Sequence, residues 1–344
     1  MQGNDGTMLR RIFPLRDAER EGAPQPRILD RMNQRSSKSR QPLKLIDRKR
    51  VFSTETPINL PFPTLGGKQI WADIFIRDGW RIQHNVLSGH CRLLDRNNIR
   101  RAWGNPAHCR ERFGVLYRQK NTAVENAHLV MLVHGLGRSA GAFTVLEDCL
   151  RRDGYAIANV NYPSTRLSIE EHADNLEQII ESLESVGTIS FVTHSLGGLV
   201  VRNLLARESS WRDRIAVHRL VMIAPPNKGS QIADRLKELP AYRWLTGASG
   251  QGLTTEAAAS LPIPEIEFGI IAGGRGTTNG FNPLLTGDND GLVTVAETAL
   301  DGAQDFMLVR TTHGLVDDHP QTIDATIAFL RNGHFNPKEP PATD

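Results

Sequence analysis

The spacing of hydrophobic and polar positions changes twice along the 344-residue chain. Residues 1–65 contain few aromatic residues and no sustained period, and they are rich in Arg, Pro, Ser and Gln. This composition is typical of a segment that buries too little apolar surface to fold. From Gln69 the chain contains short strand patterns, and from His128 strand and helix patterns alternate. We therefore expect a disordered basic arm over 1–65 and one folded domain over 66–344.

The first part of the folded domain, residues 69–120, contains strand patterns followed by a helix pattern. Asp-Gly and Ser-Gly turn signals separate three strand-forming runs, IWADIFI, WRIQHNVLS and HCRLLD. A helix is expected after them, because Asn105 is a good N-cap residue and Pro106 fits the first helical position. We expect these strands to be early strands of the sheet that the rest of the domain forms.

Residues 125–333 repeat a strand-then-helix pattern. The strand runs are largely apolar along their length: HLVMLV, YAIANVNY, TISFV, HRLVMIA, FGIIAG and DFMLVR. One of the intervening helices is expected to begin on a capping box formed by Ser168 and Glu171. Repeated units of this kind are typical of an α/β protein with a mainly parallel sheet that helices cover on both faces.

The segment 230–264 interrupts this repeat. It is longer than an ordinary connection and carries several large apolar side chains: Leu236, Leu239, Tyr242, Trp244 and Leu245. Insertions of this length either serve as lids over a site or pack as surface excursions. Both interpretations are open for this lid-like insertion.

The charge of the chain is concentrated in the arm. Residues 1–50 hold 13 Lys/Arg and 6 Asp/Glu, whereas the remaining 28 Lys/Arg and 32 Asp/Glu give the folded part a net charge of −4. A slightly acidic folded part argues against a nucleic-acid partner. The longest aliphatic runs, such as LVMLV at 129–133, are too short for a transmembrane segment, and the N-terminus lacks the apolar region of a secretory signal.

The three cysteines are too few and too scattered for a disulfide framework, which fits a reducing compartment and a cytoplasmic location. Cys91 and Cys109 each follow a histidine, but neither pair has the spacing of a zinc site. We therefore expect no metal and no cofactor.

A strand pattern stops abruptly at Ser195, and a helix pattern begins directly after it in THSLGGLVVRNLL. A serine between small residues at such a corner is typical of a nucleophile elbow, where a strained turn exposes the hydroxyl and the helix N-terminus favours a developing oxyanion. Gly197 supplies one small residue, whereas Thr193 stands where glycine is usual. We predict that Ser195 is a catalytic nucleophile.

A serine nucleophile needs a base, and the base needs an acid that holds its tautomer. Asp290 in TGDNDGLVTV and His313 in TTHGL both follow predicted strands, at the sheet edge where α/β proteins place their sites. They are the predicted acid and base. Asp288 is an alternative acid, and His319 is an alternative base that abuts a proline at the start of the last helix. His194 is expected to be a structural neighbour of the nucleophile.

The run HGLGRS, which follows the strand HLVMLV directly, predicts an oxyanion loop. Gly135 and Gly137 supply the backbone freedom that lets N–H groups converge. The expected donors are the N–H of Leu136 and the N–H of Leu196, the residue after the nucleophile. His134 is expected to brace this loop rather than to titrate during catalysis.

Together, HGLGRSAGAF, THSLGGLVVR, APPNKGS, NDGLVTV and THGLVDDHP make residues 125–333 resemble the α/β-hydrolase superfamily. Within it, the chain is similar to bacterial triacylglycerol-lipase-like serine esterases. The resemblance implies an α/β-hydrolase fold and ester hydrolysis through an acyl-enzyme, with Ser195, Asp290 and His313 as the triad. Lipases of this group often bind calcium through an Asp two residues after the catalytic His. Because Leu315 stands there, we expect no such calcium site.

The sequence thus predicts a serine hydrolase that acts on carboxylic esters, with lipid-like acyl groups favoured by the apolar insertion. A small-molecule or lipid ester is the expected partner, and a transient contact with a lipid surface is open. Thioesterase, amidase or acyltransferase chemistry is an alternative, because the same triad serves every acyl transfer. A non-catalytic scaffold that binds an anionic partner through its basic arm is a second alternative.

Overall fold

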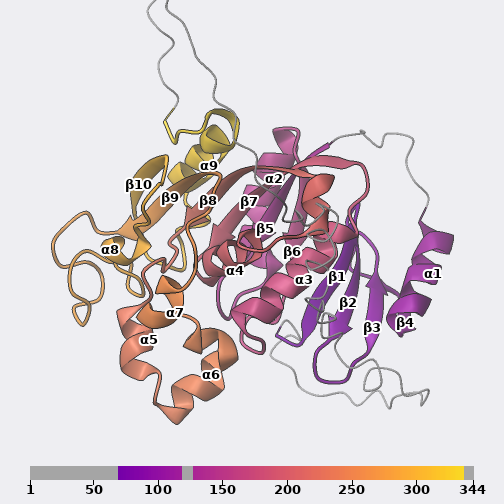
Figure 1. Cartoon of the computed structure of the whole chain (residues 1–344), viewed down its shortest axis with the longest axis horizontal. Helices are drawn as coiled ribbons and strands as arrows, with labels where there is room; N and C mark the ends of the chain where they lie inside the picture. Colours follow the sequence, from indigo (N-terminus) through magenta and orange to yellow (C-terminus); the bar gives the residue numbers. More distant parts are fainter. Residues whose placement is uncertain (1–68, 118–126, 337–344) are drawn as a thin grey trace, which may run out of the picture. The chain divides into compact units, whose positions relative to one another are not determined.

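The computed structural model describes residues 69–117 and 127–336 (Figure 1). The predicted arm over 1–65 therefore lies outside the described residues. The described strands form two sheets, one of six strands in the order β10-β9-β8-β7-β5-β6 and one of four strands in the order β1-β2-β3-β4.

The six-stranded sheet is parallel throughout, which confirms the predicted mainly parallel sheet. Its strands are β5 (Ala127–Val133), β6 (Ala156–Val160), β7 (Val186–His194), β8 (Ala216–Ile223), β9 (Glu267–Gly274) and β10 (Asp305–Arg310). Strand β7 lies in the middle, between β5 and β8. Since the strands are parallel, the loops that follow β5, β7, β9 and β10 all leave from the same edge of the sheet.

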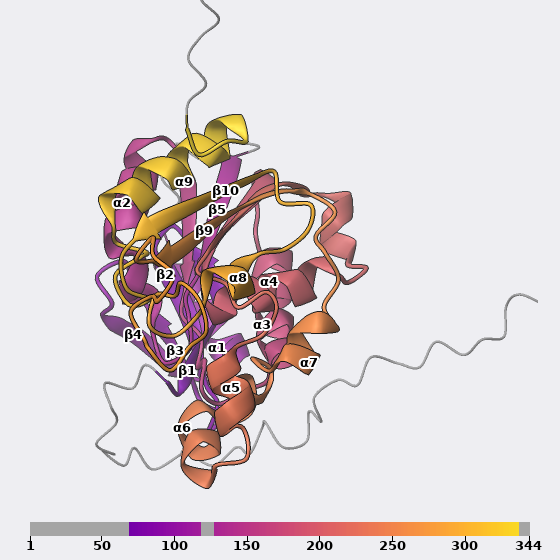
Figure 2. The same cartoon turned by 90° about the vertical axis from the view of Figure 1, so that its left-hand side faces the viewer.

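Helices cover both faces of this sheet (Figure 2). The covering helices are α2 (Thr144–Arg152), α3 (Ile169–Glu181), α4 (Leu196–Leu205) and α9 (Pro320–Asn332). Helices α2 and α9 pack on the face that carries Val130 and Leu132, and α3 and α4 pack on the face that carries Leu129 and Met131. The alternation of neighbouring strand residues between two buried clusters explains why the strand sequences are apolar throughout.

Short connecting helices complete this domain: the 3₁₀ turns η2 (Ala140–Phe143) and η3 (Ser210–Asp213) and the helix α8 (Val295–Thr298). The predicted capping box is present at the start of α3. Ser168 Oγ accepts from the N–H of Glu171 at 3.3 Å, and the Glu171 carboxylate accepts from the N–H of Ser168 at 2.8 Å. The reciprocal pair satisfies two N–H groups that a helix start leaves without partners.

The four-stranded sheet corrects one expectation. Its strands are β1 (Trp71–Arg77), β2 (Trp80–Asn85), β3 (Cys91–Leu94) and β4 (Arg100–Gly104). Among the residues that the structure describes, these strands pair only with one another, all antiparallel, in a sheet separate from the six-stranded one, so they are not early strands of the main sheet. The turn at Asp78 and Gly79, both with positive φ, closes a tight two-residue hairpin that pairs β1 with β2. The helix α1 (Pro106–Leu116) begins at the expected Asn105 cap.

Strand β4 was not predicted from the sequence. Its residues RRAWG are mostly exposed, and they lack the apolar alternation that indicates a strand. The small sheet meets the main domain through Asp73 of β1, whose N–H donates to the carbonyl of Asn161 at 2.8 Å. The Asp73 carboxylate also accepts from the N–H of Asn161 at 2.7 Å. This reciprocal pair fixes the edge of the small sheet beside the end of β6.

The insertion over 230–264 folds into the helices α5 (Gln231–Leu236), α6 (Pro240–Gln251) and α7 (Thr255–Ala259). Its base packs on the main domain, because Ser249 Oγ lies 3.0 Å from His172 Nε2 and donates to the carbonyl of Leu167 at 2.7 Å. Its outer part is exposed, with Trp244 80% accessible to solvent. Movement of this segment as a lid stays a prediction. No helix within the two described ranges combines the length and the hydrophobicity needed to cross a membrane.

Candidate active site

Ser195 occupies the corner between β7 and α4, as the sequence predicts. Its backbone angles are φ 52° and ψ −121°, a combination that is strained for a residue with a side chain. The N–H of Ser195 donates to the carbonyl of Ile223 on β8 at 2.8 Å, which holds the corner against the sheet. A Cβ atom at Gly197 would lie only 2.2 Å from the carbonyl oxygen of Val133. The close approach of α4 to β5 therefore requires glycine at this position.

Gly197→Ala is expected to destabilise the fold by about 1–3 kcal/mol, because the added methyl group meets backbone that cannot move aside. The unfolding midpoint in urea measures this loss. Gly114→Ala on α1 is the matched control, since a Cβ there meets no atom within 4 Å. It is expected to leave stability unchanged or slightly raised. An equal effect of the two substitutions would contradict the close approach at Gly197.

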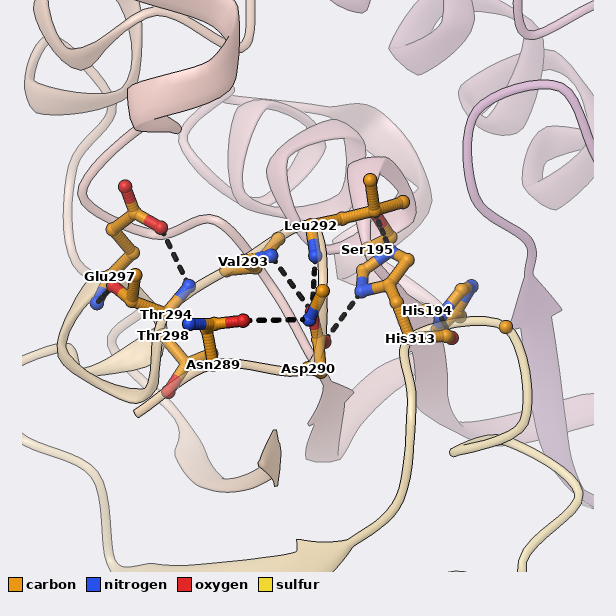
Figure 3. Close-up of polar contacts among 12 residues, drawn as sticks. His194, Ser195, Asn289, Asp290, Leu292, Val293, Thr294, Glu297, Thr298 and His313 are labelled. Atoms are coloured by element: carbon orange, nitrogen blue, oxygen red, sulfur yellow. Dashed lines mark hydrogen bonds and ion pairs between the residues drawn. The ribbon is translucent and has the colours of Figure 1, made fainter. Parts of the chain in front are cut away.

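The side chains of Ser195, His313 and Asp290 form one hydrogen-bonded series (Figure 3). His313 Nε2 lies 3.0 Å from Ser195 Oγ, and His313 Nδ1 lies 2.7 Å from Asp290 Oδ2. The other carboxylate oxygen, Oδ1, accepts from the N–H groups of Leu292 at 3.0 Å and Val293 at 2.8 Å. Since a carboxylate only accepts, Nδ1 carries the proton and Nε2 is free to accept one from the serine hydroxyl.

The two alternative residues are engaged elsewhere. The Asp288 carboxylate accepts from the N–H groups of Arg275 and Gly276, each at 2.8 Å. His319 is the N-cap of α9, where its Nδ1 accepts from the N–H of Gln321 at 3.3 Å. The structure therefore brings Asp290 and His313 together with Ser195, and it does not bring Asp288 or His319 there.

The glycine-rich loop after β5 lies directly against the serine corner. A Cβ atom at Gly135 would lie 2.8 Å from His194 Nδ1 and 3.0 Å from Ser195 Cβ. Gly137 has a φ of 71°, a conformation that favours glycine. Within the described part of the chain, the N–H groups of Leu136 and Leu196 donate to no protein acceptor. Leu196 is the first residue of α4, and the first N–H groups of a helix have no acceptor within that helix.

His134 and His194 are buried and contact the loops around them. His134 stacks on Tyr162 with ring centroids 4.2 Å apart, and its Nδ1 lies 2.9 Å from the carbonyl of Gly135. Burial lowers the pKa of His134 to about 4. His194 Nε2 lies 3.1 Å from the carbonyl of His313, and burial lowers the pKa of His194 well below its usual value. Both imidazoles are therefore neutral at neutral pH. The bracing role of His134 and the role of His194 as a structural neighbour of the nucleophile stay predictions.

Sequence reasoning missed three residues that hold the site together: Gln69, Arg138 and Asp317. The Gln69 Nε2–H group donates to the carbonyl of Arg138 at 2.6 Å, and the Arg138 guanidinium reaches Asp317 at 3.0 Å. The only local signals are an arginine inside the HGLGRS run and an acid four residues after His313. Neither signal indicates which partner the side chain contacts, because the partners are far away in the sequence.

Metal-binding side chains are not grouped in the described ranges. No three His, Cys, Asp or Glu side chains there are arranged to hold an ion. Leu315, at the position where the lipases mentioned above carry an Asp, has an apolar side chain that is 62% exposed.

The sheet order, the covering helices and the serine corner define an α/β-hydrolase fold. A family model described as "Domain of unknown function (DUF7379)" matches residues 103–260. The mature lipase BlEst2 of Bacillus licheniformis is similar in structure, with a TM-score of 0.50 and 18% identity over 63% of this chain and 95% of that chain. Its propeptide form has the same TM-score and identity over 62% of this chain and 51% of that chain.

The phospholipase PlaB of Legionella pneumophila has a TM-score of 0.46 and 16% identity over 60% of this chain and 61% of that chain. No protein of curated function matches the chain significantly in sequence. At these identities the structural likeness establishes the fold alone.

Proposed function

We propose that the protein is a serine hydrolase that cleaves carboxylic esters through an acyl-enzyme. The observation that carries this proposal is the hydrogen-bonded series from Ser195 through His313 to Asp290 at a strained strand-to-helix corner. This geometry meets the requirement that nucleophile, base and orienting acid lie in hydrogen-bond reach of one another.

In the proposed reaction, His313 Nε2 takes the proton of Ser195 Oγ as the oxygen attacks the ester carbonyl. The N–H groups of Leu136 and Leu196 donate to the oxyanion of the tetrahedral intermediate. His313 then gives its proton to the leaving alcohol, and the acyl group remains on the serine. A water molecule, deprotonated by His313, then attacks the acyl-enzyme. The bond between the acyl carbon and Ser195 Oγ breaks, His313 returns the proton to Oγ, and the acid is released.

Asp290 supports the base in two ways. Its carboxylate keeps the proton on His313 Nδ1, and its negative charge stabilises the imidazolium that forms during each proton transfer. Two backbone N–H groups and almost complete burial fix its orientation. The acid is therefore positioned by its own loop rather than by the substrate.

The surroundings of the site favour an apolar acyl group. Leu292 and Leu315 lie two residues from Asp290 and His313, respectively, and they are 51% and 62% exposed. The insertion over 230–264 also carries exposed apolar side chains, Leu239, Trp244 and Leu245, and we propose that they face the substrate. Contact between such a surface and a hydrocarbon chain is favourable, because it removes apolar area from water. The proposed substrate class is a lipid-like ester. The protein is proposed to reach it through transient contact with a lipid surface. The cytoplasmic location stays a prediction.

Intact-mass measurement after treatment with a fluorophosphonate tests the proposal. One adduct is expected on the wild-type protein and none on Ser195→Ala. Turnover of p-nitrophenyl esters from acetyl to palmitoyl then measures the preferred acyl length, with a thioester and an anilide as competing substrates. The absence of an adduct on folded wild-type protein would support the non-catalytic scaffold instead. Faster turnover of the thioester or anilide would assign the triad to that chemistry.

A further inference from the structure

The guanidinium of Arg138 connects two loops of the site that are far apart in the sequence. Arg138 belongs to the oxyanion loop after β5, two residues beyond Leu136. One terminal nitrogen donates to the carbonyl of Gly314 at 2.9 Å, and the other lies 3.0 Å from a carboxylate oxygen of Asp317. Gly314 directly follows His313. A single side chain therefore contacts both the loop of the expected oxyanion donor and the loop of the expected base.

We infer that Arg138 is a positioning residue, which holds the oxyanion loop and the histidine loop at the separation that acyl transfer needs, with Asp317 as its buried anionic partner. This inference rests on the proposed function. The reacting groups must be held to within a fraction of an ångström, because a misplacement of about 1 Å costs up to about 10²-fold in rate. Neither loop belongs to a helix or strand that would fix this separation by itself.

Hydrogen bonds also hold the main chain at Arg138. Its carbonyl accepts from Gln69 Nε2 at 2.6 Å, and the neighbouring N–H of Gly137 donates to Ser164 Oγ at 2.9 Å. The oxyanion loop is therefore anchored on one side by these contacts and on the other side by the guanidinium. An arginine suits this place because one terminal nitrogen donates to the Gly314 carbonyl while the other forms an ion pair with Asp317, whereas a lysine ammonium is a point charge on a flexible stem.

The burial of Asp317 disfavours the charged form of its carboxyl group. Its side chain is fully buried, and burial raises its pKa to about 6 even though Arg138 and His313 act in the opposite direction. Its neighbour Asp318 raises the pKa further. A carboxyl with a raised pKa in the fold contributes its stability below its ordinary pKa and loses it as the pH rises through about 6. At neutral pH the charge of Asp317 thus costs stability, and the cation that this buried charge faces is the Arg138 guanidinium.

Four variants of the full chain test the inference: Arg138→Ala, Arg138→Lys, Asp317→Asn and the double variant with Arg138→Ala and Asp317→Asn. The measurements are kcat and KM for a short p-nitrophenyl ester, the rate of fluorophosphonate labelling and the unfolding midpoint at pH 8. Arg138→Ala is expected to lower kcat and the labelling rate by about 10- to 100-fold with little change in KM. Arg138→Lys is expected to recover only part of this loss.

Asp317→Asn is expected to lower kcat by about 10-fold while the unfolding midpoint stays the same or rises. The double variant is expected to be no slower than Arg138→Ala, since Asp317 acts on the site only through Arg138 in this inference. The ratio of wild-type to Asp317→Asn activity is expected to shrink below pH about 6, where the wild-type carboxyl also becomes neutral. A purely structural pair would instead lower the midpoint and leave kcat per folded molecule unchanged.

Arg219→Ala is the matched control. Arg219 also contacts one carboxylate, that of Glu267 at 2.6 Å, and one carbonyl, that of Leu330 at 2.9 Å. It pairs with the first residue of β9, at the edge of the sheet opposite Ser195. Its replacement is expected to lower the unfolding midpoint and to leave kcat unchanged.

The outcomes separate this inference from the proposed function. If the wild-type protein is not labelled at Ser195, the proposed function fails, and the inference fails with it. If the wild-type protein is labelled and Arg138→Ala reacts at the same rate, the inference alone is wrong. Additive effects of Arg138→Ala and Asp317→Asn would also overturn it, because they would show that the two side chains act separately.

Discussion

Replacing Ser195 with alanine is expected to lower kcat by about 10⁴-fold or more without unfolding the protein. The hydroxyl is the only atom of the series that forms a bond to the substrate in the proposed reaction, so no neighbouring group can replace it. KM is expected to change little, because the N–H groups and the apolar surroundings that bind the ester remain. Turnover of a p-nitrophenyl ester, corrected for the folded fraction, measures the loss.

A matched control separates loss of the nucleophile from loss of the fold. Ser182 is the C-cap of α3, where its hydroxyl donates to the carbonyl of Ile179 at 2.7 Å. Ser182→Ala is expected to retain wild-type kcat and to lose only a little stability. Activity of Ser195→Ala within about tenfold of the wild-type value would contradict the assignment of the nucleophile.

Asp290→Asn is expected to lower kcat by about 10³- to 10⁴-fold, because it changes which tautomer of His313 is present. The amide oxygen of the asparagine is expected to keep accepting from the N–H groups of Leu292 and Val293, which leaves its NH₂ group facing His313 Nδ1. Nδ1 must then accept, and the ring proton moves to Nε2. An Nε2–H group cannot take the proton of Ser195, so the base is lost although the geometry is kept.

Asp288→Asn is the comparison that makes this prediction specific. Asp288 lies two residues away, but its carboxylate accepts from backbone N–H groups of the loop after β9. The change is expected to cost some stability of that loop and to leave kcat within a few-fold of the wild-type value. Parallel measurement of the pH–rate profiles of both variants tests the assignment. If Asp288→Asn were the severe variant, the acid would have been assigned to the wrong residue.

Much of the site follows from sequence because its residues occupy ends of elements. Strand patterns end before Ser195, Asp290 and His313, and parallel strands bring their carboxyl ends to one edge of the sheet. The glycines of the oxyanion loop are also visible in sequence, since a backbone that passes close to another leaves no room for a Cβ. The fold class and a short set of candidates for the series, Ser195 with Asp290 or Asp288 and His313 or His319, are therefore predictable without a contact map.

Other features depended on contacts between distant segments. The sequence predicted Asp290 as the acid partner of His313 but kept Asp288 as an alternative. The two residues belong to one loop, and only the directions of their side chains distinguish them. It assigned the strands of 69–120 to the main sheet, because a strand pattern shows its buried face but not its neighbour. It passed over Arg138 and Asp317, whose significance lies in a pairing across 179 positions of the chain.

The sequence by itself determined the alternation of strands and helices, the serine corner and the order of the proposed acid and base along the chain, because local periodicity, turn residues and helix caps encode them. The tertiary structure decided which acid faces the histidine, that the first strands form a sheet of their own, and that one arginine joins the two loops of the site. These outcomes depend on side-chain direction and on packing between segments that are remote in sequence. A sequence pattern does not specify the distances between such segments.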